Sequence, residues 1–225
     1  MTNPTVACVL RASPVFRPSA VVRLFEDVRE HWLGPLDFLC ITDTAIGHDG
    51  IREVELRHPW PGYWSKLNLF HPSIEGPLLY FDLDVMVCGS LADFQATRRL
   101  TMLRALRPRA GCHVNSSIMY LPKAARRPVW RRFIRDPERV IKSHAWRTGA
   151  SVYAFGDQGF LEGTWTKRRK SIAFWQETHP GQVESYKAGV RKRGGVGPNT
   201  RVVYFHGNPR PWDMGWELPP RREVQ

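Results

Sequence analysis

Short apolar runs alternate with helically spaced apolar positions in the first part of the sequence. Residues 6–10 and 36–42 are mostly apolar, which is typical of strands buried inside a sheet. Between them, a stretch that begins at Ser19 repeats its apolar residues at helical spacing and ends before Gly34 and Pro35. Strand, helix and strand in this order predict a βαβ unit, whose right-handed crossover makes the two strands parallel.

One long apolar stretch contains two acidic residues. Residues 78–87 follow Gly76 and Pro77, and eight of these ten residues are apolar. The exceptions are Asp82 and Asp84. We predict one strand over residues 78–87, buried on both faces inside a parallel sheet. Side chains two positions apart on a strand point to the same side, so we expect the two carboxylates to lie side by side at its end.

Two neighbouring carboxylates need a counter-charge. At this range one carboxylate raises the pKa of the other, and burying an unpaired ion is costly. A divalent cation would balance Asp82 and Asp84, and their oxygen ligands suit Mg²⁺ or Mn²⁺. The alternative interpretation is that one aspartate caps the following turn while the other is solvated at the edge of the sheet.

The remaining pattern completes one α/β domain over residues 1–225. We predict strands over residues 51–56, 100–106, 114–121 and 201–205, and helices over residues 64–70, 123–133 and 138–146 and around Asp157. The predicted architecture is a Rossmann-like, mostly parallel sheet flanked by helices. Because ligands of such sheets bind at the carboxyl ends of the strands, residues 10–13, Asp43 and Asp82 should meet there.

Several other polar residues are candidates for the same site. Lys66 is the one cation of the predicted helix 64–70, where it would reach a phosphate beside the metal. Asn115 and Ser116 are small and polar where a buried strand needs bulk, which indicates either a ligand or a strand edge satisfied by its own hydrogen bonds. Asp157 is either a helix cap or a site residue.

Two segments lack a clear pattern. Residues 164–200 are basic and aromatic, and we predict an excursion over the site or a mobile loop there, at which the acceptor is recognised. Residues 213–225 are rich in proline and charge, and we predict a loosely held tail.

The charge of the chain narrows its possible partners. Its formal net charge of +12 attracts polyanions such as nucleic acid, an anionic membrane surface or a phosphorylated substrate. A hydrophobic content of 42% excludes a disordered chain. No run approaches the about 18 apolar residues of a membrane span, and residues 1–5 do not resemble a signal peptide. We therefore expect a cytoplasmic protein, with peripheral contact at the inner membrane surface as a further option.

The cysteines indicate neither a metal site nor redox chemistry. The chain has four cysteines, widely spaced and without a Cys-x-x-Cys motif. In a reducing compartment, such residues are expected to be buried free thiols.

Five short motifs occur in a fixed order along the chain. They are Trp-Ser-Lys-Leu at 64–67, Tyr-Phe-Asp-Leu-Asp at 80–84, Asn-Ser-Ser-Ile-Met at 115–119, Asp-Gln at 157–158 and Gly-Asn-Pro-Arg-Pro-Trp at 207–212. From about Val6 to Trp212, this order resembles the family 8 glycosyltransferases. These are the glycogenin-like and lipopolysaccharide galactosyltransferase-like enzymes, which have the GT-A fold.

Three positions depart from the family pattern. The family has a metal-binding histidine three residues before the closing glycine, where this chain has Tyr204, whereas His206 directly precedes Gly207. Either His206 supplies the ligand through a shifted backbone, or the metal keeps only the two aspartates. Ser117 replaces a glycine, and Arg210 replaces a lysine, which keeps the charge but not the shape.

The resemblance implies a metal-dependent transfer of a sugar from a nucleotide-diphosphate donor, a UDP-sugar, with retention of configuration. The acceptor would be a glycan or a lipid-linked molecule, and the positive charge of the chain favours an anionic one. Mn²⁺ or Mg²⁺ would be bound by Asp82, Asp84 and His206. The donor would be bound by Lys66, Asp43, Asn115, Ser116, Gly207 and Arg210. Asp157 and Gln158 would be the catalytic residues, with Asn115 and Asp157 hydrogen-bonded to sugar hydroxyls and Gln158 close to the anomeric carbon.

Two other functions fit part of the pattern. Nucleotidyl transfer onto a sugar phosphate would use the same fold, but that class opens with a glycine-rich loop, and residues 10–14 contain no glycine. Nucleic-acid binding would explain the positive charge, but two acids at the centre of a basic face argue against it.

Overall fold

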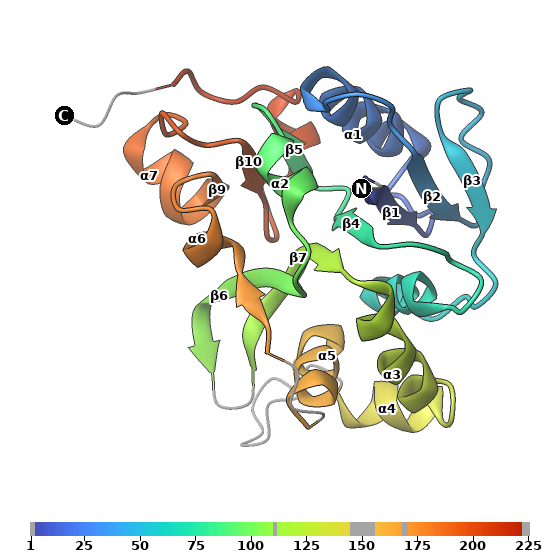
Figure 1. Cartoon of the computed structure of the whole chain (residues 1–225). Helices are drawn as coiled ribbons and strands as arrows, with labels where there is room; N and C mark the ends of the chain where they lie inside the picture. The colour runs from blue at the N-terminus through green and yellow to red at the C-terminus, as the bar shows by residue number, and fades with distance from the viewer. Residues whose placement is uncertain (1–2, 110–111, 145–155, 168–170, 222–225) are drawn as a thin grey trace.

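The structure of the chain is a computed structural model that describes residues 3–109, 112–144, 156–167 and 171–221. Within these residues, the strands form two sheets that are covered by helices (Figure 1). The strands are β1 (Thr5–Leu10), β2 (Phe38–Thr42), β3 (Arg52–Glu55), β4 (Leu78–Phe81), β5 (Val85–Val87), β6 (Thr101–Arg109), β7 (Cys112–Leu121), β8 (Ala173–Phe174), β9 (Val183–Ser185) and β10 (Val202–Tyr204).

The helices are of three kinds. The α-helices are α1 (Pro18–His31), α2 (Ala92–Ala96), α3 (Lys123–Phe133), α4 (Pro137–Ser143), α5 (Gly156–Lys167), α6 (Trp175–Thr178) and α7 (Arg191–Arg193). The 3₁₀-helices are η1 (Gly62–Phe70) and η3 (Pro211–Met214), and η2 (Tyr186–Val190) is a π-helix.

The larger sheet has the predicted architecture. Seven of the described strands form it, in the order β3-β2-β1-β4-β7-β6-β8. The first four strands of this order are parallel neighbours, β7 is antiparallel to both β4 and β6, and β8 is parallel to β6. Only β7 among these seven strands therefore runs against the others, and the predicted mostly parallel α/β sheet flanked by helices is confirmed.

Both faces of this sheet are buried. In β1, Val6, Cys8 and Leu10 belong to the core that contains the apolar face of α1. Ala7 and Val9 point the other way, into the core formed with η1, α3 and α5. Because each face has its own core, the central strands are continuous apolar runs rather than alternating ones.

The chain passes from the larger sheet into a second sheet directly after β4. Within the described residues, this second sheet has the order β5-β10-β9, with β5 antiparallel and β9 parallel to β10. The prediction of a single strand over residues 78–87 is therefore wrong. The chain turns after Phe81, and the N–H of Val85 donates to the carbonyl of Asp82 at 3.2 Å. The apolar pattern hides this break because both halves are buried, each in a different sheet.

Other elements differ from their predictions in detail. Residues 64–70 lie within a 3₁₀-helix rather than an α-helix. The helix predicted over residues 138–146 is α4, which ends at Ser143, and residues 145 and 146 lie outside the described ranges. In α4 the side chain of Asp136 accepts the N–H of Arg139 at 3.0 Å, which is a typical N-cap. The four cysteines are free; Cys8, Cys40 and Cys112 are buried as expected, whereas Cys88 is half-buried.

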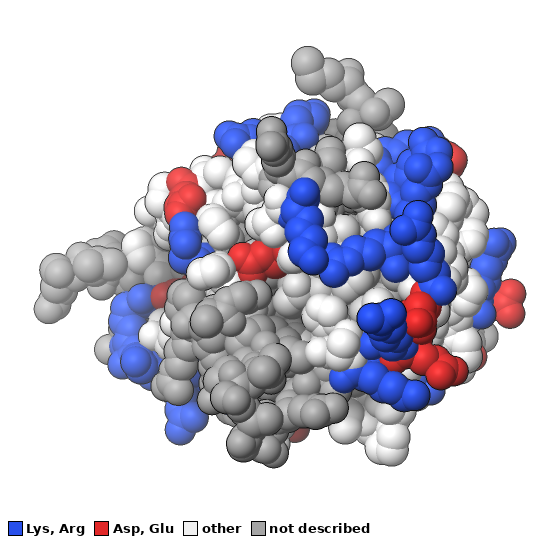
Figure 2. Space-filling view, turned by 90° about the horizontal axis from the view of Figure 1, so that it is seen from below, with Lys and Arg blue, Asp and Glu red and all other residues white. Residues whose placement is uncertain are grey.

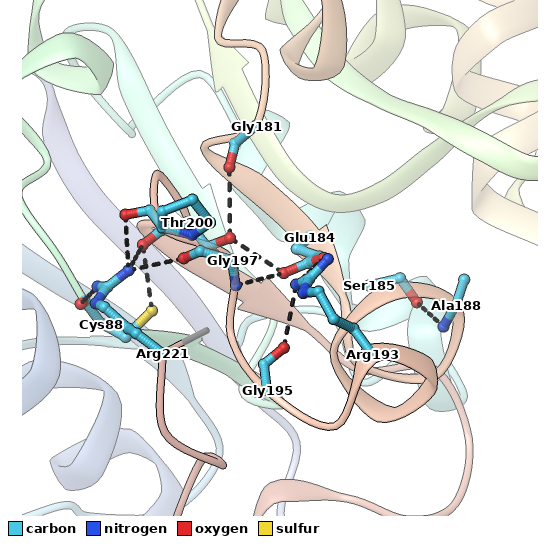
Figure 3. A network of polar contacts seen from close by, with 11 residues as sticks. Cys88, Gly181, Glu184, Ser185, Ala188, Arg193, Gly195, Gly197, Thr200 and Arg221 are labelled. Atoms are coloured by element: carbon cyan, nitrogen blue, oxygen red, sulfur yellow. Dashed lines mark hydrogen bonds and ion pairs between the residues drawn. The ribbon is translucent and has the colours of Figure 1, made fainter. Parts of the chain in front are cut away.

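The described part of residues 164–200 contributes to the second sheet. Glu184 of β9 accepts hydrogen bonds from Arg193, from the N–H of Gly197 at 3.3 Å and from the hydroxyl of Thr200 at 3.1 Å (Figure 3). These contacts fold residues 186–200 back onto β9. Whether this segment recognises an acceptor stays a prediction.

The described part of residues 213–225 contacts the same region. Arg221 donates hydrogen bonds to the carbonyls of Gly197 at 3.0 Å, Thr200 at 2.9 Å and Cys88 (Figure 3). Arg221 therefore joins the end of the chain to the exit of β5 and to the entry of β10. Among the described residues, no helix is both long enough and apolar enough to span a membrane.

Candidate active site

The two sheets bring separate parts of the sequence together at the turn between β4 and β5. β5 pairs with β10 in antiparallel register, with Val85 opposite Tyr204. The residues that precede β5 therefore lie beside those that follow β10, and the N–H of Phe205 donates to the carbonyl of Asp84 at 3.2 Å. On the other side, the N–H of Asp82 donates to the carbonyl of Ser117 in β7 at 2.8 Å.

A cavity of about 760 Å³ lies at this junction. It is lined by residues that follow β1, by η1, by the β4–β5 turn, by β7, by α5 and by the segment after β10. The residues singled out in the sequence that line it are Lys66, Asp82, Asp84, Asn115, Gln158, His206, Gly207 and Arg210. Asp43, Ser116 and Asp157 do not line it, and each of these three contacts residues around it.

Lys66 is a buried cation between two carboxylates. Its Nζ lies 3.0 Å from Asp82 Oδ1 and 3.4 Å from Asp157 Oδ2, and it donates to the hydroxyl of Ser116 at 2.8 Å. The Ser116 hydroxyl in turn donates to Asp157 at 2.7 Å. Burial alone would lower the pKa of Lys66, but the charges of Asp82 and Asp157 outweigh burial and raise it. Lys66 therefore stays protonated and balances both acids.

The hydroxyl of Tyr80 adds to this cluster. It donates to Asp82 Oδ1, and Lys66 Nζ lies 5.3 Å from the centre of the Tyr80 ring. Burial and the nearby charge of Asp82 raise the pKa of Tyr80 well above its usual value. Tyr80 is therefore a neutral donor that fixes the Asp82 carboxylate.

Arg210 is the partner of the second aspartate. Its guanidinium forms an ion pair with Asp84, which is buried. The same guanidinium lies 5.4 Å from the ring centre of Phe16 and 6.0 Å from that of Trp212. Burial lowers the pKa of Arg210, and the acids near it, Asp82 and Asp213, oppose this shift. Arg210 is held in the cavity wall by one charge and two aromatic faces.

His206 and Gly207 form the wall next to the second sheet. Nε2 of His206 lies 3.1 Å from the hydroxyl of Ser185, the last residue of β9. Tyr204, at the family's histidine position, is buried within β10, and burial raises its pKa to about 12. Gly207 has a φ of +65°, a backbone conformation that residues other than glycine rarely adopt.

Asp43 and Asn115 hold the backbone around the cavity. Asp43 Oδ1 accepts the N–H of Ala12 at 2.9 Å, which fixes the residues after β1. Asn115 Oδ1 accepts the N–H of Ser117 at 2.8 Å. Asp43 does not line the cavity but binds the backbone of Ala12, which does, whereas Asn115 lines the cavity itself.

The two aspartates fit a divalent cation that completes its shell with phosphate oxygens. Among the described residues, no three His, Cys, Asp or Glu side chains are grouped so that they are able to hold a metal ion. Mg²⁺ seldom needs such a group, because it is usually bound by one or two carboxylates together with substrate phosphates and water. Asp82 and Asp84 are hard oxygen donors on one cavity wall, which meets that requirement.

The sequence did not single out two other side chains of this cavity. Arg11 follows β1 and donates to the carbonyl of Trp60 at 2.6 Å. Tyr63 is 41% exposed at the cavity, and its ring would lie 2.6 Å from a β-carbon added to Gly156. Neither belongs to a motif, and Arg11 was expected at this edge of the sheet only as part of residues 10–13.

No protein-family model matches the sequence, and no curated protein matches it either. Solved structures do. The glycosyltransferase GlyE of Streptococcus pneumoniae TIGR4 matches with a TM-score of 0.61 and 15% identity over 94% of this chain. The match covers 56% of the GlyE chain, so this chain spans little more than half the length of that protein.

A second similar structure is that of LgtC. An active-site mutant of LgtC matches with a TM-score of 0.60 and 14% identity, over 92% of this chain and 89% of the LgtC chain. The structure of the galactosyltransferase LgtC in complex with donor and acceptor sugar analogs matches with a TM-score of 0.59 and 16% identity, again over 92% of this chain and 89% of the LgtC chain. At these identities the likeness shows the fold, and it confirms the GT-A fold expected from the sequence.

Proposed function

We propose that this protein is a glycosyltransferase that moves a sugar from a UDP-sugar to a glycan or a lipid-linked acceptor, with retention of configuration. The observation that carries the proposal is the gathering of eight singled-out residues from five separate segments around one cavity. The GT-A fold supports it, and LgtC, which shares this fold, has been solved with donor and acceptor sugar analogs.

In the proposed reaction, the bond between C1 of the sugar and the diphosphate breaks, and a bond to an acceptor hydroxyl oxygen forms on the same face. Negative charge develops on the leaving diphosphate, so cations directed at its oxygens lower the barrier. Lys66 and Arg210 are the proposed cations, because both line the cavity. The acceptor proton leaves with the departing diphosphate or with water.

The sugar would be oriented by neutral side chains of β7 and α5. We propose that Asn115 donates to a sugar hydroxyl and that Gln158 faces the anomeric carbon, since both line the cavity. Asp157 contacts Lys66 and Ser116 rather than the cavity itself. We assign Asp157 a positioning role, in which it holds the ammonium of Lys66 at the cavity wall.

A divalent cation, Mn²⁺ or Mg²⁺, would be held by Asp82 and Asp84 together with diphosphate oxygens. Bound there, it would neutralise charge on the leaving group. Arg210 pairs with Asp84, so a bound ion would share that carboxylate with the guanidinium. His206 remains the third candidate ligand, beside Ser185.

The acceptor is proposed to be anionic or located at an anionic membrane surface. Figure 2 shows Lys and Arg side chains gathered in a band on part of one face, with a group of Asp and Glu side chains beside it. On α3, the exposed Lys123, Arg127 and Arg131 recur every four residues and so lie along one side of the helix. Such a row attracts phosphorylated or acidic surfaces, and the attraction weakens with salt.

The proposal is tested by the binding of uridine diphosphate with and without Mn²⁺, followed as a shift in thermal unfolding. A ligand that binds only the folded state raises its stability. We expect stabilisation of the wild type by uridine diphosphate that depends on Mn²⁺. In Asp82→Asn and in Asp84→Asn, the affinity should fall at least about tenfold, because each variant removes a charged ligand.

The matched control is Asp49→Asn, which changes an exposed aspartate that has no ion-pair partner in the described parts of the chain. This variant should respond like the wild type. If no nucleoside diphosphate shifts the unfolding of the wild type under any metal, the proposed function is wrong. If binding occurs, hydrolysis and transfer assays with a set of UDP-sugars then identify the donor sugar.

A further inference from the structure

Lys187 lies behind the cavity wall that contains Gly207. It belongs to the π-helix η2, which directly follows β9, and β9 is paired with β10. A β-carbon added to Gly207 would lie 3.4 Å from Lys187 Nζ. Gly207 lines the cavity, and the ammonium of Lys187 lies next to the place where a side chain of Gly207 would begin.

Within the described residues, Lys187 has no acidic partner of the kind that Lys66 and Arg210 have. Lys66 pairs with Asp82 and Asp157, and Arg210 pairs with Asp84. In the described parts of the chain, no hydrogen bond or ion pair involves the half-buried Lys187 ammonium. The charge of Lys187 is therefore not already neutralised next to Gly207, which lines the cavity.

The position of Lys187 is coupled to the segment that follows β10. The hydroxyl of Ser185 accepts the N–H of Ala188 at 3.2 Å and so caps the π-helix (Figure 3). The same hydroxyl lies 3.1 Å from Nε2 of His206. Ser185 therefore links η2 to the residues next to Gly207. Single-turn π-helices are rare and occur frequently at functional sites.

We propose that Lys187 binds the diphosphate of the nucleotide donor, beside Gly207. This inference rests on the proposed function and adds a residue to it. The ammonium donates hydrogen bonds to phosphate oxygens, and its charge stabilises the diphosphate as it leaves. Lys66 and Arg210 are paired with aspartates, so Lys187 adds a positive charge that is not neutralised in this way. The backbone of Gly207 gives phosphate oxygens close access to it.

The test compares Lys187→Gln and Lys187→Arg with the wild type in calorimetric binding of uridine diphosphate, uridine and inorganic pyrophosphate. In Lys187→Gln, the loss of one charge-assisted contact should lower the affinity for uridine diphosphate and for pyrophosphate by about tenfold or more. Uridine has no phosphate, so its affinity should not change. Lys187→Arg should recover most of the loss, because it keeps the charge.

The matched control is Lys192→Gln, which removes the same charge from an exposed position on α7. It should leave the binding of all three probes unchanged. The inference is overturned if Lys187→Gln binds uridine diphosphate as the wild type does, or if it loses uridine to the same degree.

The two proposals fail in different ways. If the wild type binds pyrophosphate through Lys187 but binds no nucleoside diphosphate, the proposed function is wrong and the phosphate site stands. If it binds uridine diphosphate with no help from Lys187, the function stands and the inference is wrong. If it binds neither probe, both proposals are wrong.

Discussion

At the scale of single residues, Lys66 determines the electrostatics of the cavity. Its buried ammonium forms ion pairs with Asp82 and Asp157 and donates a hydrogen bond to Ser116. This cation lies between the two acids and is the counter-charge of both. Without it, at least one buried carboxylate would lack a counter-charge.

We therefore expect Lys66→Met to lower the free energy of unfolding by about 3–5 kcal/mol, the usual cost of breaking a buried ion pair on one side. Urea unfolding at neutral pH measures the change. Lys123→Met is the control, because Lys123 pairs with Glu75 on the surface, where such pairs contribute about 1 kcal/mol or less. Similar losses in both variants would show that Lys66 is not the counter-charge of the site.

Residue identity alone indicated some of this site and not the rest. Asp82, Asp84 and Lys66 stand out in the sequence because charged residues are unusual next to a buried strand. Tyr63 and Lys187 do not stand out, because an exposed or half-buried polar residue in a loop or short helix is ordinary, and Arg11 was indicated only as part of residues 10–13. Only the pairing of β10 with β5 and β9 brings Lys187 near the cavity.

At the scale of elements, hydrophobic periodicity predicted where strands and helices occur but not where one sheet ends. Residues 78–87 form two strands because β4 pairs with β1 and β7, whereas β5 pairs with β10. Those partners lie far away in the sequence, so local pattern carries no sign of the change. Helix α1 was predicted well, because its apolar face is regular and Pro18 begins it.

Helix α1 also contains a buried acid. Asp27 Oδ1 pairs with Arg23 at 3.0 Å, while Oδ2 is buried and has no hydrogen-bond partner among the described residues. Burial is the main cause that raises the pKa of Asp27 from 3.8 to about 6, against the opposing charge of Arg23. The folded state therefore binds this proton more tightly than the unfolded state does.

The stability contributed by protonated Asp27 should be complete below about pH 4 and should be lost as the pH rises through about 6. The loss is at most about 3 kcal/mol, from a shift of about two pKa units. Asp27→Asn should remove this dependence, so that it is more stable than the wild type at about pH 7.5 and similar to it at about pH 4. Chemical unfolding across this pH range measures both proteins, and parallel curves would contradict the assignment.

At the scale of the whole molecule, the end of the described chain helps to hold the second sheet. Arg221 donates to carbonyls at the exit of β5 and before β10, next to the network of Glu184 (Figure 3). The prolines and charges of residues 213–225 predicted a loose tail because they indicate no regular element. They do not indicate hydrogen bonds to distant carbonyls, which only the folded chain forms.

We expect Arg221→Ala to lower the free energy of unfolding by about 1–2 kcal/mol, the contribution of hydrogen bonds from a charged donor. Amide hydrogen exchange should also become faster in residues 200–205, which lead to the cavity. Arg191→Ala, at an exposed position on α7, is the control and should change neither quantity. Unchanged exchange in the Arg221 variant would show that the second sheet does not depend on the tail.

The turn between β4 and β5 connects the two sheets through three residues, and two of them are Asp82 and Asp84. Each acid is tied to a different side, Asp82 to Lys66 on η1 and Asp84 to Arg210 after β10. Helix α1 packs on β1 of one sheet and on β5 of the other, so it bridges the two sheets beside the turn that connects them. We therefore expect substitutions that repack α1 against β1 or β5 to change the spacing of the two carboxylates, although α1 itself does not line the cavity.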